Sequence, residues 1–87
     1  MERNAKNRLG FVGIIIHDRD TSAEAVNHVL HQHAKMFVGR MGVPYKERNV
    51  GVITLIVDAT TDEIGALTGQ LGKIKGVSVK SAMSKID

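Results

Sequence analysis

The sequence predicts an α+β sandwich, with one four-stranded antiparallel sheet and two helices on one face of that sheet. Four short runs rich in aliphatic and β-branched residues alternate with two amphipathic segments in the order βαββαβ. The stretches "IIIHDRDTSAE" and "LIVDATTDE" repeat one pattern, a strand that ends in Asp before a capped helix. Two right-handed strand-helix-strand crossovers joined by a hairpin give the ferredoxin-like fold, with the first and third strands at the centre of the sheet.

Residues 9–18 form the first predicted strand, because the run is apolar, rich in isoleucine and too short for a stable helix. Side chains alternate across a strand, so both faces of this strand are apolar. The two sets are Leu9, Phe11 and Ile15 on one face and Val12, Ile14 and Ile16 on the other.

The first helix follows, and Thr21 with Glu24 matches the capping box that opens a helix. We expect this helix to end near Lys35. Apolar residues recur along it at helical spacing and predict the stripe that faces the sheet. This stripe consists of Val26, Val29, Leu30 and Ala34.

Residues 36–43 are predicted as the second strand, which Pro44 closes, and residues 44–49 as a connection. The third strand covers residues 50–58 and is again apolar on both faces. Its two sets are Val50, Val52 and Ile56 on one face and Ile53, Leu55 and Val57 on the other.

The second helix opens with the same capping signal at Thr60 and Glu63, and Gly76 ends the turn before a fourth strand over residues 77–84. Its apolar stripe consists of Ile64, Leu67, Leu71 and Ile74. The opposite side carries Gly65, Gly69 and Gly72. Each helical glycine costs about 1 kcal/mol relative to alanine. This ridge either lets another chain or a small ligand approach closely, or is solvated surface that tertiary packing tolerates.

The length of 87 residues predicts one domain, with a flexible arm over residues 1–8 and a single folded unit over residues 9–87. A chain of this size buries only about 60–65% of the surface that its unfolded form exposes. It has no cysteine, so disulfides and thiolate metal sites are excluded, and oligomerisation is the remaining common source of stability. We expect a cytoplasmic protein, since neither a signal peptide nor an apolar segment of bilayer length is evident.

With both helices on one face of the sheet, the opposite face keeps the second apolar set of strands 9–18 and 50–58. Leaving such surface in water costs about 25 cal/mol per Å². Exposed patches of this kind usually mark an interface. We therefore predict a homo-oligomer, a dimer or tetramer, formed by sheet-to-sheet pairing.

His28 and His31 lie three residues apart on one helix face, with His33 close by, a spacing that can place two imidazoles on a metal ion. A structural site needs about four ligands, and no further partner is evident. The sequence therefore predicts no metal site and no cofactor, and leaves His28 and His31 as the only metal candidates.

Asp18 and Asp58 close the two central strands. Taking these strands to run parallel, we expect the two carboxylates to be neighbours at one end of the sheet, with His17 beside them. Such a pair can hold a cation or share a proton. More commonly, acids in this position favour the positive ends of the helices that follow.

No nucleophile, base and orienting group can be picked out together, so we predict that the protein is not an enzyme. RNA-binding modules with the same element order stack bases on aromatic residues of the sheet. The only aromatic residues here are Phe11, Phe37 and Tyr45. Twelve basic residues among nine acidic ones give a formal charge of only +3, and we do not expect direct DNA binding.

The stretch "IGALTGQLGKIKGVSVKS" at residues 64–81, together with "RMGVP" at residues 40–44 and the aliphatic third strand, resembles the regulator family of the iron-only hydrogenase system. The resemblance covers about residues 9–84. It implies an ACT-like fold, related to the C-terminal sensor domain of the nickel-responsive regulator NikR. Such modules pair through sheets or edges and bind effectors between subunits.

The chain departs from these relatives at three points. It has neither the ribbon-helix-helix segment nor the nickel-site cysteine of NikR, and "HDRDTSAEA" has no glycine where amino-acid-binding ACT domains usually carry one. The identity of the effector and its binding residues therefore do not transfer from the relatives to this chain.

The resemblance implies an oligomeric regulatory or ligand-sensing module associated with the iron-only hydrogenase system. This module would bind a small-molecule effector and act through a protein partner, without a DNA-binding domain of its own. Two alternatives stay open. One is a metal-sensing or metal-carrying module that uses His28 and His31, and the other is a small enzyme with a cavity at the subunit boundary.

Overall fold

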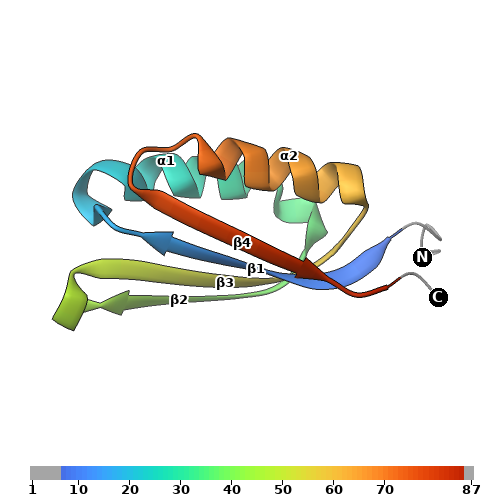
Figure 1. The fold of residues 1–87 in the computed structure, drawn as a ribbon, viewed down its shortest axis with the longest axis horizontal. Coiled ribbons are helices and arrows are strands. Elements are labelled where there is room, and N and C mark those ends of the chain that lie inside the picture. The colour runs from blue at the N-terminus through green and yellow to red at the C-terminus, as the bar shows by residue number, and fades with distance from the viewer. Residues whose placement is uncertain (1–6, 86–87) are drawn as a thin grey trace.

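A computed structural model describes residues 7–85 and shows one layer of strands beneath one layer of helices (Figure 1). The elements follow the predicted order βαββαβ, with a short 3-10 turn before the second strand and another after it. They are β1 (Arg8–Ile16), α1 (Arg19–Gln32), η1 (Ala34–Met36), β2 (Phe37–Tyr45), η2 (Lys46–Arg48), β3 (Val50–Ala59), α2 (Thr61–Gly72) and β4 (Val77–Met83).

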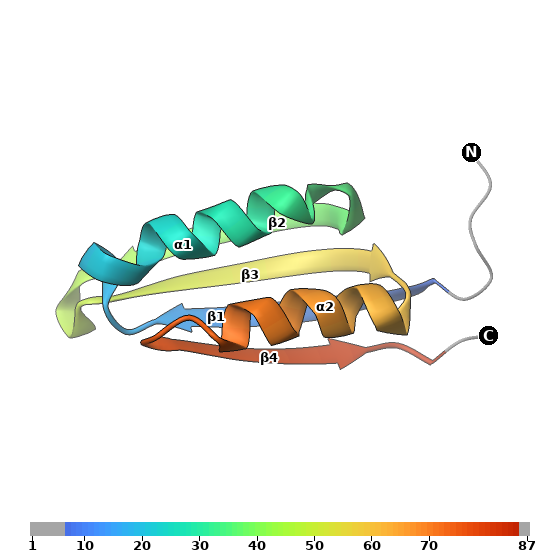
Figure 2. The ribbon, with the colours of Figure 1, turned by 90° about the horizontal axis from the view of Figure 1, so that it is seen from above.

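The four strands pair in the order β2-β3-β1-β4, and every neighbouring pair is antiparallel. Both helices lie over the same face of this sheet, as Figure 2 shows from above. The predicted α+β sandwich is confirmed. The prediction that the two central strands run parallel is wrong, because the β2–β3 hairpin reverses the chain and β3 therefore runs opposite to β1. Leu9 pairs with Asp58 at one end of β1, and Ile16 pairs with Gly51 at the other.

The hydrophobic core fills the space between the sheet and the two helices. The predicted alternation along the central strands is confirmed, since one apolar set is buried beneath the helices and the other is exposed or half-buried. Ala34, which we predicted on the inward stripe, is exposed because α1 ends before it. The buried apolar residues are Val12, Ile14, Ile16, Val26, Leu30, Met36, Ile53, Leu55, Val57, Ala59, Ile64, Leu67 and Leu71.

The start of α2 follows the sequence prediction. The Thr60 hydroxyl accepts a hydrogen bond from the Glu63 backbone N–H at 3.1 Å. The Glu63 carboxylate in turn accepts one from the Thr60 N–H at 2.8 Å, which completes the capping box.

The start of α1 differs from the prediction, because the helix begins at Arg19 and Asp18, not Thr21, is the N-cap residue. Ser22 is buried in the first turn, and its hydroxyl donates a 2.6 Å hydrogen bond to the backbone carbonyl of Lys75. This contact ties the first turn of α1 to the turn before β4. It cannot be seen from local sequence, since the two residues are far apart in the chain.

Pro44 does not close β2, which continues to Tyr45 with Pro44 opposite Gly51. β2 lies at the edge of the sheet, where a residue without an N–H can be accommodated. The register also shifts between Phe37 and Gly39, as in a β-bulge. A bulge and a proline both discourage pairing with a further strand at this edge.

The arm predicted over residues 1–8 falls largely outside the described residues, and β1 already includes Arg8, which pairs with Ala59. No helix among residues 7–85 is long and apolar enough to cross a membrane.

Candidate functional site

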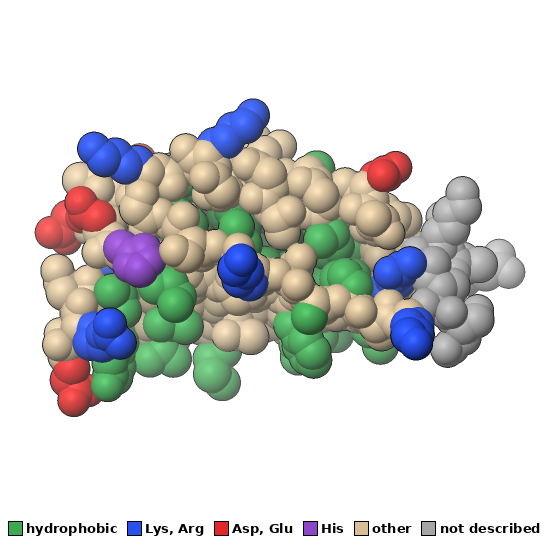
Figure 3. Space-filling model, viewed as in Figure 1, with side chains coloured by type: hydrophobic (Ala, Val, Ile, Leu, Met, Phe, Trp, Pro, Cys, Tyr) green, Lys and Arg blue, Asp and Glu red, His purple; other side chains and the backbone are tan. Residues whose placement is uncertain are grey.

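The sheet surface opposite the helices, here called the open face, is the candidate functional site. Among residues 7–85, every large apolar side chain that stays exposed belongs to β1, β2 or β3. Figure 3 shows apolar side chains projecting along the lower side of the molecule, away from the helices. The exposed residues are Leu9, Phe11, Ile15, Val38, Met41, Val43, Tyr45 and Ile56.

Strand register arranges the apolar side chains of the open face in rows across the sheet. Phe11 on β1 pairs with Ile56 on β3, and β4 extends this row with Ala82. A second row runs from Ile15 through its partner Val52 on β3 to Val43 on β2.

Between these two rows, Gly13 of β1 carries no side chain. Gly13 pairs with Thr54 on one side and with Lys80 on the other. A β-carbon built on Gly13 would meet nothing within 4 Å. The missing side chain leaves a local gap at Gly13, between the Phe11 row and the Ile15 row, while its neighbours Thr54 and Lys80 carry exposed side chains.

Charge is confined to the margins of the open face. Within the described strands, the register places only Lys80 and Asp58 on this face as charged residues. Lys80 lies on the edge strand β4, and the half-buried Asp58 pairs with Leu9 near the end of β3. An uncharged apolar centre with polar residues at its rim is typical of protein interfaces.

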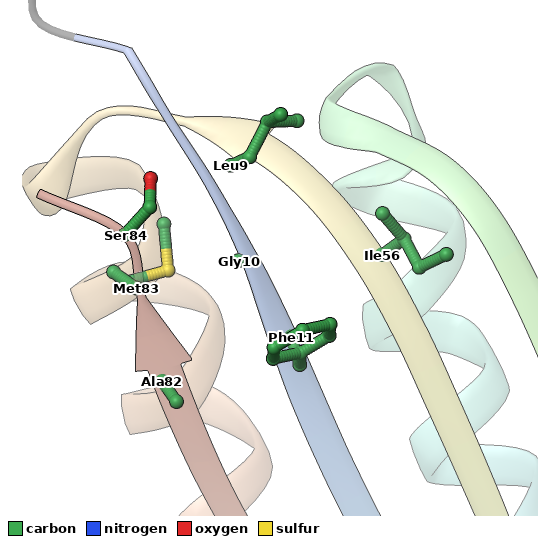
Figure 4. A pocket seen from close by; sticks show the side chains of 7 residues that line it. All are labelled: Leu9, Gly10, Phe11, Ile56, Ala82, Met83 and Ser84. Carbon is green, nitrogen blue, oxygen red and sulfur yellow. The ribbon is translucent and has the colours of Figure 1, made fainter. Parts of the chain in front are cut away.

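A hollow of about 380 Å³ opens where β1 begins and β4 ends (Figure 4). Its walls are apolar apart from one side-chain hydroxyl, so it can receive an apolar group but offers no acid or base for catalysis. The lining residues are Leu9, Gly10, Phe11, Ile56, Ala82, Met83 and Ser84.

The predicted pair of carboxylates does not form. Asp58 lies at the end of the sheet where β1 begins, whereas Asp18 follows the opposite end of β1. The prediction is wrong because β3 runs antiparallel to β1. His17, expected beside both acids, instead shares a 3.0 Å hydrogen bond between its Nε2 atom and Ser78 Oγ.

The histidines of the first helical region do not converge. His28 and His31 are exposed on α1, and the His33 ring donates a hydrogen bond to the Gln70 side-chain carbonyl at 3.2 Å. Among residues 7–85, no group of three or more His, Asp or Glu side chains is placed to hold a metal ion.

The glycines of α2 are exposed on the side opposite its apolar stripe, as the helical wheel predicts. A β-carbon on Gly65 or Gly69 would meet nothing within 4 Å, while one on Gly72 would lie 4.0 Å from a Val79 methyl group. The ridge is therefore sterically open to a neighbour. Close approach of another chain or a small ligand stays a prediction, as does the alternative that the ridge is solvated surface.

Sequence reasoning missed the contribution of β2 to the open face. Val38, Met41, Val43 and Tyr45 are all exposed, with Met41 at 67%. Taking Pro44 as the end of the strand hid this contribution. The alternation of Met41, Val43 and Tyr45 is the signal that would have revealed it.

Comparison with known proteins gives one family match. The sequence model of the TM1266-like family, described as "Iron-only hydrogenase system regulator, putative", matches residues 8–81. No curated protein sequence matches the chain significantly.

The solved structures that resemble the fold include the following three. TM1266 from Thermotoga maritima shares 37% sequence identity at a TM-score of 0.87, covering 91% of this chain and 99% of that one. The ACT domain of GTP pyrophosphokinase from Chlorobium tepidum has a TM-score of 0.74 at 17% identity, covering 87% and 99% of the two chains. The C-terminal domain of the Mycobacterium tuberculosis MgtC protein has a TM-score of 0.66 at 14% identity, covering 95% and 94%.

Proposed function

We propose a regulatory function for this chain, which belongs to the TM1266-like family. In this proposal the protein is a homo-oligomeric module that senses a small molecule and acts through partner proteins of the iron-only hydrogenase system. The family match and the ACT-like fold support a regulatory role. The single observation that carries the oligomeric part is the uncharged apolar centre of the open face.

A second copy of the chain is the occupant that best suits the open face. In a two-fold symmetric contact each residue of the interface meets the same surface on its partner, so a charged centre would repel itself. Here the centre is uncharged, and Lys80 and Asp58 lie at its margins. The gap at Gly13 leaves room for an apolar side chain such as Phe11 of the other copy.

The size of the chain gives the same pairing a thermodynamic reason. A single layer of helices covers only one face of the sheet, and Phe11 remains 61% exposed in one copy. Burying such side chains against a second sheet contributes roughly 25 cal/mol per Å² of apolar surface removed from water. Sheet-to-sheet pairing would therefore bury the open face, which one copy leaves exposed to water.

The regulatory action is assigned to partners because residues 8–83 are taken up by the elements of the sandwich and the turns between them. Any effect on transcription would then need a separate DNA-binding protein. Binding of a small molecule at or near the subunit contact would change the affinity between copies, and pairing would change the affinity for that molecule by the same factor.

Sedimentation equilibrium over a wide range of concentrations tests the pairing. We expect the wild type to be a dimer or tetramer at micromolar concentration. Phe11→Glu should shift it to a monomer, because two buried carboxylates would face the apolar centre of the partner. Ala25→Glu, at an exposed position of α1, adds the same charge away from the open face and should leave the mass unchanged.

A wild-type chain that stays monomeric in this range would overturn the proposal. An equal decrease in the molar mass of the assembly in the Phe11→Glu and Ala25→Glu variants would also contradict it. Pairing would then depend on net charge and not on the open face. Retained circular dichroism in both variants would establish that each still folds.

A metal-sensing module is the second candidate, motivated by the spacing of His28 and His31 on α1. Calorimetric titration of the wild type with nickel, zinc and iron(II) tests it. We expect no saturable heat, because two exposed imidazoles fall short of the four ligands of a structural site. Saturable heat that disappears in His28→Ala and persists in His33→Ala would favour the metal-sensing function instead.

A further inference from the structure

A second hollow opens at the other end of the sheet, where β2 turns through η2 into β3. Its volume is about 200 Å³, and it shares no lining residue with the hollow of Figure 4. This second hollow, here called the hairpin pocket, is lined by Ile15, His17, Tyr45, Arg48, Val50 and Val52.

The floor of the hairpin pocket is apolar. Ile15 and Val52 are cross-strand partners on β1 and β3, and Val50 pairs with Tyr45 on β2. Their side chains stand on the open face, so the aliphatic floor continues the apolar surface of the sheet. An apolar ligand body that covers this floor gains about 25 cal/mol per Å² of surface removed from water.

Three residues with polar side chains, each from a separate segment, also line the hairpin pocket. Arg48 comes from η2, Tyr45 from the end of β2, and His17 from the loop after β1. The guanidinium of Arg48 and the hydroxyl of Tyr45 have no hydrogen-bond or ion-pair partner among residues 7–85. No acidic residue lines the pocket.

His17 is held in place by two contacts. Its backbone N–H donates to the Gly76 carbonyl at 2.7 Å, and its Nε2 atom shares a hydrogen bond with Ser78 Oγ at 3.0 Å. Arg48 is followed directly by Asn49, whose left-handed backbone (φ 55°) fixes the turn back into β3. The backbone at His17 is therefore held by a hydrogen bond, and the backbone after Arg48 by a defined turn.

We propose that the hairpin pocket binds a small carboxylate with an apolar body. An arginine fork matches the two oxygens of a carboxylate and forms bidentate charge-assisted hydrogen bonds. Tyr45 also lines the pocket and carries a hydroxyl that can donate to the ligand, and the aliphatic floor covers the rest of the ligand. The volume lies below the roughly 300–1,000 Å³ of pockets that hold drug-sized ligands, which restricts the ligand to a small molecule.

This inference rests on the proposed sensing function and names the site and the chemical class of its ligand. Because the hairpin pocket lies at one end of the open face, a second copy seated on that face would border it. Ligand binding would then strengthen or weaken pairing, and pairing would change the affinity for the ligand by the same factor. Inorganic phosphate would reach Arg48 but leave the aliphatic floor wet, so we expect it to bind far more weakly.

Nuclear magnetic resonance titration of the full chain at constant ionic strength tests the inference. Phenylacetate is the probe, phenylacetamide is its neutral match, and inorganic phosphate is the anion without an apolar body. We expect saturable shifts of the backbone amides of residues 45–50 with phenylacetate. Binding of phenylacetamide should be at least about tenfold weaker, because the charged hydrogen bonds to Arg48 are lost.

Three variants sharpen the result. Arg48→Gln should weaken phenylacetate binding by about tenfold or more, and Tyr45→Phe, which keeps the ring, by roughly three- to tenfold. Lys46→Gln removes a positive charge from the same 3-10 turn without changing a lining residue, and should keep the wild-type affinity. The comparison separates a contact with Arg48 from general attraction by positive charge.

Equal binding of phenylacetate and phenylacetamide, or equal losses in Arg48→Gln and Lys46→Gln, would overturn the inference. The neutral-match arm uses only wild-type protein and does not depend on the folding of any variant. Sedimentation of the same samples keeps the two proposals apart. A paired protein that ignores phenylacetate overturns the ligand assignment alone, whereas a monomeric protein overturns the proposed function.

Discussion

Phe11 of β1 and Ile56 of β3 stand directly opposite each other on the open face, and both remain exposed, at 61% and 44%. Cross-strand pairs of an aromatic and a β-branched residue stabilise a sheet by roughly 0.2–1 kcal/mol. That gain is small compared with the free energy available from burying the apolar surface that the pair leaves in water, about 25 cal/mol per Å². Substitutions at Phe11 and Ile56 therefore test most directly what covers the open face.

The first prediction concerns the thermal stability of the paired protein. If copies pair through the open face, the melting temperature should rise with chain concentration, because association stabilises only the folded state. Phe11→Thr and Ile56→Thr keep β-forming residues and should abolish this dependence. Differential scanning calorimetry at several concentrations measures it, and a wild-type melting temperature that ignores concentration would contradict the prediction.

The second prediction concerns Gly10, which pairs with Met83 at the edge of the Figure 4 hollow. A β-carbon there would overlap the Met83 sulfur and lie 2.6 Å from the backbone oxygen of Ala82. Backbone cannot yield as a side-chain end can, so Gly10→Ala should lower the free energy of unfolding by about 1–3 kcal/mol. Urea denaturation measures the loss.

Gly13→Ala is the matched control for Gly10→Ala, because the same change on the same strand points into open space. It should leave the fold of one copy intact and weaken pairing if the gap at Gly13 receives a side chain of the partner. Equal destabilisation by the two substitutions would show that the overlap with Met83 and Ala82 does not decide the cost.

The third prediction concerns the capping of the two helices. Thr60→Ala removes the acceptor of the Glu63 N–H and should cost about 1 kcal/mol of stability, within the usual range of roughly 0.5–2 kcal/mol. Thr21→Ala should change stability by less than about 0.5 kcal/mol, because Thr21 is exposed within α1 and does not cap it. Chemical denaturation of both variants measures the difference.

The fourth prediction concerns the glycine ridge of α2. Gly65→Ala and Gly69→Ala should each stabilise the fold by up to about 1 kcal/mol, since both positions are helical and sterically open. Denaturation gives the stability, and sedimentation of the same variants gives the assembly state. A stabilised fold with weakened assembly would identify the ridge as a contact between chains, whereas unchanged assembly would identify it as solvated surface.

Local sequence determined the order of the elements and the two sets of side chains on the central strands. The alternation of apolar residues along residues 9–18 and 50–58 was enough to separate the buried set from the exposed set, because strand geometry is strictly two-sided. The capping box of α2 was equally local, since Thr60 and Glu63 satisfy each other within one turn.

Tertiary structure decided the features that depend on distant partners. The hydrogen bond from Ser22 to Lys75 ties the first turn of α1 to the turn before β4. The hairpin decides the direction of β3 and so places Asp18 and Asp58 at opposite ends of the sheet. The hairpin pocket gathers His17, Tyr45 and Arg48 only because β1, β2 and η2 meet at one end. Sequence periodicity indicates which face of its own strand or helix a residue occupies. How the strands and helices are placed against one another depends on contacts between segments far apart in the chain.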